Sequence, residues 1–224
     1  MSKVVGLDGC RDGWIAAVVE DGCLRSVEYH KSASLAIDAH ADATIFAFDI
    51  PIGLSNKGLR AADTAARRIL RGRKSSVFNA PPLAAIDATT YAEASRVSKL
   101  VSGRGLTRQS FNLFPKIRDV AAVAGGDDRI YEAHPEVSFL ELAGGDLPPP
   151  KKTWDGVMRR RALLSSCGLR IPDVVGNASS HSEVDDIADA MVCAWTAGRI
   201  TSGNARPFPN PAERIKGRAV AIWC

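Results

Sequence analysis

The sequence predicts an α/β protein in which a mixed β-sheet is flanked by helices. Short apolar runs typical of buried strands come first in the chain, and longer segments with the apolar spacing of helices follow them. A further short apolar run separates two groups of these helices. Leading strands joined by tight turns, followed by strands that alternate with helices, indicate a sheet that is antiparallel on one side and parallel beyond it.

The first fifty residues contain most of the expected strands. The first two apolar runs are continuous, as in central strands. Asp21-Gly22 then favours the positive φ angles of a two-residue hairpin turn, so the weaker run after it is expected to pair with the second strand. The elements expected here are strands over 4–7, 14–19, 24–29 and 44–50, with a short helix around 34–40.

The remaining elements are mostly helical. Pro115 is expected to kink or divide the helix in which it lies. Thr153 is a candidate N-cap and Gly168 a candidate stop for a later helix, and residues 170–181 are expected to form a loop. The elements expected here are helices over 60–70, 91–101, 107–124, 136–142, 153–167 and 182–200, with strands over 129–133 and 219–223.

Composition indicates one cytoplasmic globular domain over residues 1–224. Hydrophobic residues make up 46% of the chain and charged residues 24%, as is usual for globular proteins. No apolar run approaches a membrane span, and Arg11 and Asp12 interrupt the stretch that a signal peptide would need. The five scattered cysteines form no CxxC pair, which favours reduced thiols. The four histidines lack HxxxH and HExxH spacing, so a zinc site is not expected.

Residues 57–125 are expected to form a basic helical insert between the fourth and fifth strands. Residues 60–118 hold twelve Lys and Arg against three acids, a net charge of +9, which leaves −5 for the rest of the chain. This block is either a solvated helical surface or a face that binds phosphate or nucleic acid. On the second interpretation, the nucleic-acid-binding residues are Arg11, Arg67, Arg71, Arg73, Lys74 and Lys116.

Two aspartates stand where strands end. Asp8 follows one apolar run between nearby glycines, and Asp49 ends another just before a proline turn. Aspartate is depleted in strands and almost never lies buried without a partner. Each could be a turn residue that binds backbone N–H groups. Each could instead face a cation, in which case the glycines beside Asp8 leave room for a phosphate.

A third acid lies inside the helix expected over 182–200. Ser182 and Asp185 form a capping-box pattern, and Asp186 also lies in the first turn, where the helix dipole favours anions. Asp189 lies beyond that turn at the edge of an apolar face, where an ionised carboxylate is costly unless it is paired or binds metal. Asp186 precedes it by three residues, so the two side chains can point the same way.

These acids can converge at one edge of the sheet and hold divalent metal. Asp8, Asp49 and Asp189 are the expected ligands of Mg²⁺ or Mn²⁺, which prefer oxygen ligands. Asp186 and Glu136 are expected to assist them as further catalytic residues, although Glu136 is also well explained as a first-turn acid. Two such ions about 4 Å apart would activate water and stabilise the leaving oxygen in phosphodiester cleavage.

Several motifs of the chain resemble the family called domain of unknown function 429, which is predicted to comprise nucleases of ribonuclease H-like fold. The matching stretches include VVGLDGCRDGW, FDIPIGL, LTRQSFNLFPKIRDV, EAHPEVSF and DDIADAMVCAWTA. The resemblance implies a ribonuclease H-like mixed sheet with three antiparallel leading strands, then parallel strands. Holliday-junction resolvases of that superfamily carry acids in positions similar to those of Asp8, Asp49 and Asp189. The basic insert departs from their pattern and leaves the substrate open.

The expected function is metal-dependent hydrolysis of DNA or RNA. No membrane partner is expected, and a homodimer is one possible oligomeric state. Actin-like phosphotransferases share the fold and an Asp-Gly phosphate loop, so ATP binding is an alternative. They use two duplicated domains, however, and 224 residues leave room for one. A non-catalytic nucleic-acid-binding module is a further alternative. A serine or cysteine hydrolase is not expected, since Cys10 and Ser110 have no pattern that pairs them with a base.

Overall fold

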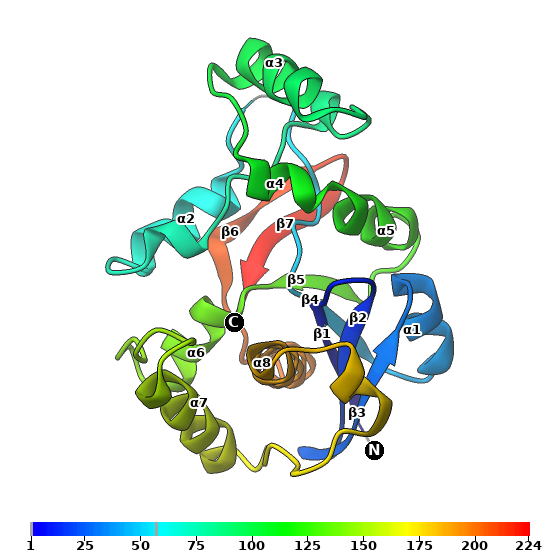
Figure 1. Cartoon of the computed structure of the whole chain (residues 1–224), viewed down its shortest axis with the longest axis vertical. Helices are drawn as coiled ribbons and strands as arrows, with labels where there is room; N and C mark the ends of the chain where they lie inside the picture. The colour runs from blue at the N-terminus through cyan, green and yellow to red at the C-terminus, as the bar shows by residue number, and fades with distance from the viewer. Residues whose placement is uncertain (1, 57) are drawn as a thin grey trace.

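The computed structural model describes residues 2–56 and 58–224, which form a mixed α/β fold around one seven-stranded sheet (Figure 1). The strand order is β3-β2-β1-β4-β5-β7-β6. Strands β1, β4, β5 and β7 run parallel to one another, whereas β2, β3 and β6 run antiparallel to their neighbours. The strands are β1 (Lys3–Gly9), β2 (Trp14–Glu20), β3 (Cys23–His30), β4 (Ile45–Phe48), β5 (Ile130–Ala133), β6 (Pro207–Ile215) and β7 (Arg218–Trp223).

Helices cover both faces of this sheet. The α-helices are α1 (Ala33–Ala39), α2 (Ala61–Ile69), α3 (Tyr91–Ser102), α4 (Arg108–Asn112), α5 (Phe114–Ala124), α6 (Pro135–Leu142), α7 (Trp154–Ser166) and α8 (Val184–Thr201). Short 3₁₀ turns lie at η1 (Lys74–Ser76), η2 (Leu83–Ala85) and η3 (Gly176–Ser180). No helix in the described part of the chain is long and apolar enough to cross a membrane.

Side-chain alternation along β1 divides the core into two layers. Val5 and Leu7 pack into the cluster that includes α1 and α5, whereas Val4 packs into the cluster built on α8. Figure 1 shows α8 nearly end-on at the centre of the molecule, with α6 and α7 on its side of the sheet and α1 and α5 across from them. The two faces therefore have separate hydrophobic contacts, and residues at odd and even positions of β1 meet different helices.

Helix α8 lies directly against β1 because Gly6 has no side chain. A Cβ built at Gly6 would collide with the backbone of Ala190 and Ala194 in α8. A Cβ at Gly13 would likewise collide with the carbonyl of His30. These two glycines permit close chain packing, so the expectation that they leave room for a phosphate is wrong. Of the three glycines near Asp8, only Gly9 could take a Cβ without a clash, since the Cβ would lie in ordinary contact, 3.7 Å from the Lys116 side chain.

The helical insert lies between β4 and β5 and comprises α2 to α5 with η1 and η2. Its expected first residue, 57, lies outside the described residues. The long helix expected over 107–124 is divided at Leu113, and Pro115 lies in the first turn of α5, where it needs no hydrogen-bond donor. The division at this proline is therefore confirmed.

A buried ion cluster fastens the insert to the sheet. Arg60 precedes α2 and is 1% exposed. Its guanidinium binds Glu132 of β5 at 2.7 Å and Asp63 of α2 at 2.5 Å. Glu132 also accepts a hydrogen bond of 2.7 Å from the backbone N–H of Ile52. Both carboxylates are thus paired inside the protein, and the start of the insert is held against β5.

Strand β6 is not among the elements expected from the sequence. It contains three prolines, at positions 207, 209 and 211, and proline cannot donate to a strand ladder. The strand tolerates them because it lies at the edge of the sheet, where one side needs no partner, and because its pairing with β7 is irregular between Phe208 and Glu213. An apolar-pattern rule misses such a strand, since prolines interrupt it.

Candidate functional site

The first two expected acids lie side by side at the carboxyl edge of the parallel strands. Leu7 of β1 is in register with Phe48 of β4, so Asp8 and Asp49 follow at the same level. Asp8 shares the face of Gly6, which is the face covered by α8. A cleft of about 300 Å³ opens here, and both aspartates line it. Ligands of α/β proteins commonly bind at this edge of the sheet.

The third acid reaches the same place from α8. Asp189 lies in the second turn of this helix and is 2% exposed. With Asp49 it lines a second, smaller cleft. One carboxylate oxygen, Oδ2, accepts a hydrogen bond of 2.6 Å from Lys151, whereas the buried Oδ1 makes no hydrogen bond. The close approach of α8 to β1 at Gly6 therefore brings all three aspartates to one site.

Burial and mutual repulsion disfavour ionisation of this cluster. Burial raises the pKa of Asp8 well above its usual range, and the charges of Asp49, Asp189 and Asp186 raise it further. Burial also raises the pKa of Asp49, although His134, Lys151 and a hydrogen bond with Asp8 oppose the shift. Burial raises the pKa of Asp189 to about 7 despite its contact with Lys151. One ammonium group is therefore insufficient to balance the carboxylates.

Lys151 is a residue of the candidate site that sequence reasoning did not single out. It lies in the connection before α7, and its ammonium group binds Asp189 at 2.6 Å and Asp185 at 2.9 Å. Burial opposes its charge, but these two carboxylates outweigh that effect and raise the pKa of Lys151. The local sequence shows only a pair of lysines after three prolines. This pattern does not predict that Lys151 binds Asp185 and Asp189, which lie far along the chain.

Asp186 has a local structural role at the start of α8. Its side chain accepts a hydrogen bond of 2.8 Å from the backbone N–H of Glu183, which is the N-cap residue. The capping box expected at Ser182 and Asp185 is therefore wrong by one position, and Asp185 instead binds Lys151. Asp186 nevertheless lines the main cleft beside Asp8. It caps the helix and adds negative charge to the site.

Glu136 is already neutralised by two arginines. Its Oε2 accepts a hydrogen bond of 2.5 Å from Arg73, and its Oε1 accepts one of 2.6 Å from Arg160. It lines the smaller cleft with Asp49 and Asp189. Because both oxygens have charged donors, Glu136 acts as an anchor between α6, α7 and the insert at the border of the site.

His134 follows β5 and lines both clefts. Its Nε2 lies 3.2 Å from the carbonyl oxygen of Ser76, and its buried Nδ1 makes no hydrogen bond. The ring is thus held by the insert and supports the site from beside the acids. The Nδ1 atom is a second buried polar atom of the site without a partner, after Oδ1 of Asp189.

The expected basic residues fall into different environments. Arg11 and Lys116 line the main cleft, and the ammonium group of Lys116 also lies 4.8 Å from the ring centre of Trp14. Arg67 donates hydrogen bonds to Val77 and Asn79, so its guanidinium is engaged within the insert.

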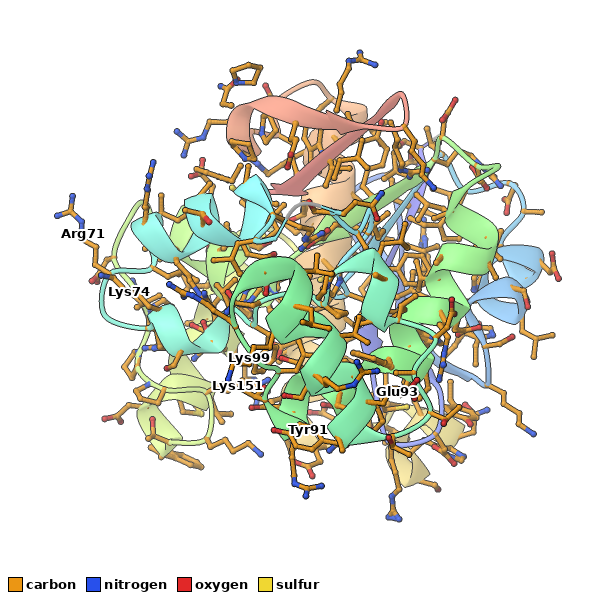
Figure 2. All side chains as sticks on the ribbon, turned by 90° about the horizontal axis from the view of Figure 1, so that it is seen from above. Arg71, Lys74, Tyr91, Glu93, Lys99 and Lys151 are labelled. Atoms are coloured by element: carbon orange, nitrogen blue, oxygen red, sulfur yellow. The ribbon has the colours of Figure 1, made fainter. Side chains whose placement is uncertain are left out.

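Two basic residues, Arg71 and Lys74, make no side-chain hydrogen bond or ion pair with the described residues. Arg71 and Lys74 are exposed, and Figure 2 shows both at the rim of the molecule, with Arg71 extending outward into solvent. Arg73, between them, binds Glu136 instead. The outer surface of the insert therefore presents Arg71 and Lys74 to solvent, whereas Arg67 and Arg73 bind groups within the protein.

The aspartate cluster has the chemistry of a site for a hard divalent cation. Asp8, Asp49 and Asp189 offer carboxylate oxygens, and Oδ1 of Asp189 is buried without a donor. Magnesium is commonly held by one or two carboxylates together with water and substrate phosphates. The site is not a closed cage, since the one group of three ligand atoms found within 4.8 Å of one another among the described residues lies elsewhere. With the side chains as they stand, the three carboxylates therefore do not all reach a single ion.

Comparison with known proteins gives one match. The model of a family described as "Protein of unknown function (DUF429)" matches residues 6–214. The matched segment contains the three aspartates, Lys151 and the whole basic insert. No curated protein and no solved structure matches the chain.

Proposed function

The chain belongs to the family described as protein of unknown function DUF429, and from its carboxylate site we propose that it hydrolyses phosphodiester bonds of nucleic acid with divalent metal ions. The proposal includes a ribonuclease H-like arrangement of the sheet. The topology supports it, because three leading antiparallel strands, β1 to β3, are followed by β4 and β5 parallel to β1.

The observation that carries the proposal is the unbalanced negative charge at the carboxyl edge. Asp8, Asp49 and Asp189 all have raised pKa values, caused first by burial, and Oδ1 of Asp189 lacks any donor. Buried, mutually repelling carboxylates are costly when ionised, so they either stay protonated or bind a compensating cation, and the proposal takes the second course. Lys151 supplies one positive charge, and a dication would supply the rest.

Asp8, Asp49 and Asp189 would hold Mg²⁺ or Mn²⁺. When bound at such a site, these ions activate a water molecule and stabilise the leaving oxygen of a phosphodiester. The protein contributes the placement of its carboxylates: Asp8 after β1 lines the main cleft, Asp189 of α8 lines the smaller one, and Asp49 after β4 lines both. The glycine at position 6 fixes how near α8 comes, and therefore how near Asp189 lies to Asp8.

Two further side chains can act on the substrate directly. The ammonium group of Lys151 lines the cleft and is shared between Asp185 and Asp189. With a cation on Asp189, it keeps Asp185 as its partner and presents its remaining donors to a substrate phosphate. His134 lines the same cleft, so its ring can contact a bound substrate.

The basic residues around the cleft favour a polyanionic substrate. Arg11 and Lys116 line the cleft itself, while Arg71 and Lys74 stand exposed on the insert. Phosphate contacts of this kind provide most of the sequence-independent affinity for nucleic acid. The substrate is proposed to run from the cleft across the insert.

The first experiment is a cleavage screen on single-stranded, duplex and branched DNA and RNA, with Mn²⁺ or Mg²⁺ and with chelator. Cleavage by the wild-type protein should require the metal. Asp8→Asn and Asp189→Asn should abolish it, whereas Asp173→Asn, which changes an exposed acid in a loop, should not. Cleavage that persists in chelator, or in both site variants, would contradict the proposal.

Thermal stability separates the proposal from its alternatives, because a ligand that binds the native state raises the melting temperature. Mn²⁺ alone should stabilise the wild-type protein but not Asp189→Asn. Stabilisation by ATP with Mg²⁺, and not by Mn²⁺ alone, would favour a phosphotransferase. Stabilisation by an oligonucleotide in chelator, without cleavage in any metal, would favour a binding module.

A further inference from the structure

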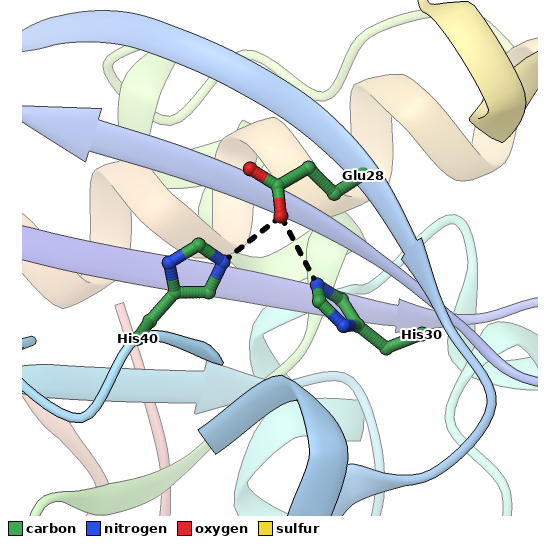
Figure 3. A group of neighbouring side chains, drawn as sticks. All are labelled: Glu28, His30 and His40. Carbon is green, nitrogen blue, oxygen red and sulfur yellow. Dashed lines mark hydrogen bonds and ion pairs between the residues drawn. The ribbon is translucent and has the colours of Figure 1, made fainter. Parts of the chain in front are cut away.

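A second group of potential metal ligands lies on the edge strand β3, outside the carboxylate site. Glu28 and His30 belong to β3, and His40 is the C-cap residue of α1 (Figure 3). One ligand atom from each residue lies within 4.8 Å of the other two, and no other trio with this spacing occurs in residues 2–56 and 58–224.

Strand and helix geometry bring these three side chains together. Residues two apart in a strand point to the same face, so Glu28 and His30 are neighbours on β3. Helix α1 packs against β3, and its C-cap places His40 beside them. The imidazole side chains are 12% exposed at His30 and 8% at His40, while that of Glu28 is 35% exposed. The trio is thus sheltered on the histidine side and open to solvent at the glutamate.

The distances match those between ligands of one small metal ion. Glu28 Oε2 lies 3.1 Å from Nε2 of His40 and 3.3 Å from Nε2 of His30. Zinc binds such nitrogen and oxygen atoms at about 2.0–2.2 Å, which in tetrahedral geometry separates the ligand atoms by about 3.3–3.5 Å. Figure 3 shows both rings directed at the same carboxylate oxygen.

The hydrogen bonding of the trio is incomplete without an ion. His30 Nε2 is buried and lacks a hydrogen bond of acceptable geometry, despite its nearness to Glu28. The other carboxylate oxygen, Oε1, accepts a hydrogen bond of 2.5 Å from Ser26. Ser26 therefore orients Glu28, as residues around metal ligands commonly do, and leaves Oε2 directed at the two rings.

We propose that Glu28, His30 and His40 form a zinc-type metal site with a fourth position open to water or to an external ligand. Imidazole ligands favour Zn²⁺ and related transition metals, whereas the all-carboxylate site favours Mg²⁺ and Mn²⁺. The ion would join β3 to the end of α1. The expectation that the chain has no zinc site considered helical spacings such as HxxxH, whereas this site combines strand spacing with a distant histidine.

The test is titration of the full chain with Zn²⁺ by calorimetry, in buffer with excess Mg²⁺ to occupy the carboxylate site. The wild-type protein should bind one equivalent. Glu28→Gln and His30→Gln should each weaken binding at least tenfold. The matched control is His181→Gln, since His181 stacks on Tyr29 with ring centres 3.7 Å apart and therefore lies on the opposite face of β3. The His181→Gln variant should bind Zn²⁺ with the affinity of the wild-type protein.

Two controls make the result decisive. The melting temperature of each variant in chelator checks its fold, and the Glu28→Gln substitution, at a half-buried position, keeps the shape of the side chain. Asp189→Asn should retain one equivalent of Zn²⁺, which separates this site from the proposed catalytic one. X-ray absorption should show two imidazole ligands on the bound zinc. Absence of Zn²⁺ binding, or equal affinity in wild type, Glu28→Gln and His30→Gln, would overturn the proposal.

Discussion

The burial of the Asp189 side chain conflicts with the negative charge of its ionised carboxylate. The side chain is buried between α8 and the sheet, yet its Oδ1 has no donor and its pKa is raised to about 7, first by burial. Burial and the missing hydrogen-bond donor at Oδ1 would favour an uncharged side chain at this position. A bound dication removes the conflict, because it lowers the cost of the ionised form. The residue is therefore expected to lower the stability of the metal-free protein.

The Asp189→Asn substitution should reduce the pH dependence of the free energy of unfolding, measured in chelator. The carboxyl pKa is 3.8 in the unfolded chain and about 7 in the fold, so between these values the native state binds more protons. The free energy of unfolding should then fall as pH rises from about 4 to 7 and level off above that range. Melting temperatures across this range should show the fall in wild type and a smaller one in the variant.

The same substitution distinguishes a metal ligand from a structural ion-pair partner. At pH 8 in chelator, the variant should be at least as stable as wild type, and Mn²⁺ should stabilise only wild type. A loss of about 3–5 kcal/mol in the variant is typical of breaking a buried ion pair. That outcome would mean that Asp189 serves mainly to hold Lys151.

If Asp189 binds the proposed metal ion, Lys151 competes with that ion for its carboxylate. Its ammonium group binds the carboxylate at 2.6 Å, and a positive charge at this distance repels a second cation. Lys151→Met should therefore bind Mn²⁺ more tightly, by roughly tenfold or about 1.4 kcal/mol, as measured by calorimetry. Cleavage should nevertheless fall, because the proposed phosphate contact is lost. Lys152→Met, next in the chain and more exposed, should change neither property, and unchanged Mn²⁺ affinity in Lys151→Met would refute the competition.

At the scale of the element, a buried arginine helps to fasten the insert to the sheet. Arg60 alone neutralises Asp63 and Glu132, and burial raises the pKa of Glu132 while Arg60 opposes that shift. The cluster joins α2 to β5, the strand that leads directly to His134. The position of the insert over the cleft therefore depends on charge pairing as well as on apolar packing.

Arg60→Ala should destabilise the protein by about 3–5 kcal/mol, because it leaves two buried carboxylates without a counter-charge. Urea unfolding at neutral pH measures this difference. Arg68→Ala, an exposed arginine of the same helix, is the matched control and should change stability by less than about 0.5 kcal/mol. Similar small effects in both variants would show that the cluster does not fasten the insert.

At the scale of the whole molecule, charge is divided between the insert and the rest of the chain. Residues 60–118 carry +9 and the remaining residues −5. Three of the arginines in this segment, Arg60, Arg67 and Arg73, already bind groups within the protein. The surface available to a polyanion is therefore smaller than the sequence suggests. Its exposed basic residues include Arg71 and Lys74 (Figure 2), and also Arg68, Arg96, Lys99, Arg104, Arg108 and Arg118.

Binding of duplex DNA should weaken steeply with salt, with a log–log slope near −0.9 for each phosphate contact. The double variant Arg71→Ala/Lys74→Ala should bind more weakly and reduce the magnitude of that slope by about 1–2. Fluorescence anisotropy with a labelled oligonucleotide measures both. The double variant Arg159→Ala/Arg161→Ala on α7 removes two exposed arginines outside the insert and should have little effect. Equal slopes in the two variants would contradict a binding role for Arg71 and Lys74.

The sequence by itself determined the elements and the three principal acids. Apolar runs ending in Asp8 and Asp49 marked two strand ends, and the acid inside an apolar helical face marked Asp189. These signals are local, because strand and helix periodicity depend on residues a few positions apart. The mixed α/β fold follows from the same patterns, while the proline-containing edge strand β6 escaped them.

Only the tertiary structure decided which partner each charged residue has. It showed that Lys151 binds Asp189, that Glu136 and Glu132 are neutralised by arginines, and that His40 joins Glu28 and His30. The partners in these contacts come from different elements, and most lie far apart in sequence. Their meeting depends on the register of β1 with β4, the approach of α8 at Gly6 and the packing of α1 on β3. Local periodicity sets which way a side chain points, but the packing of distant segments sets what it meets.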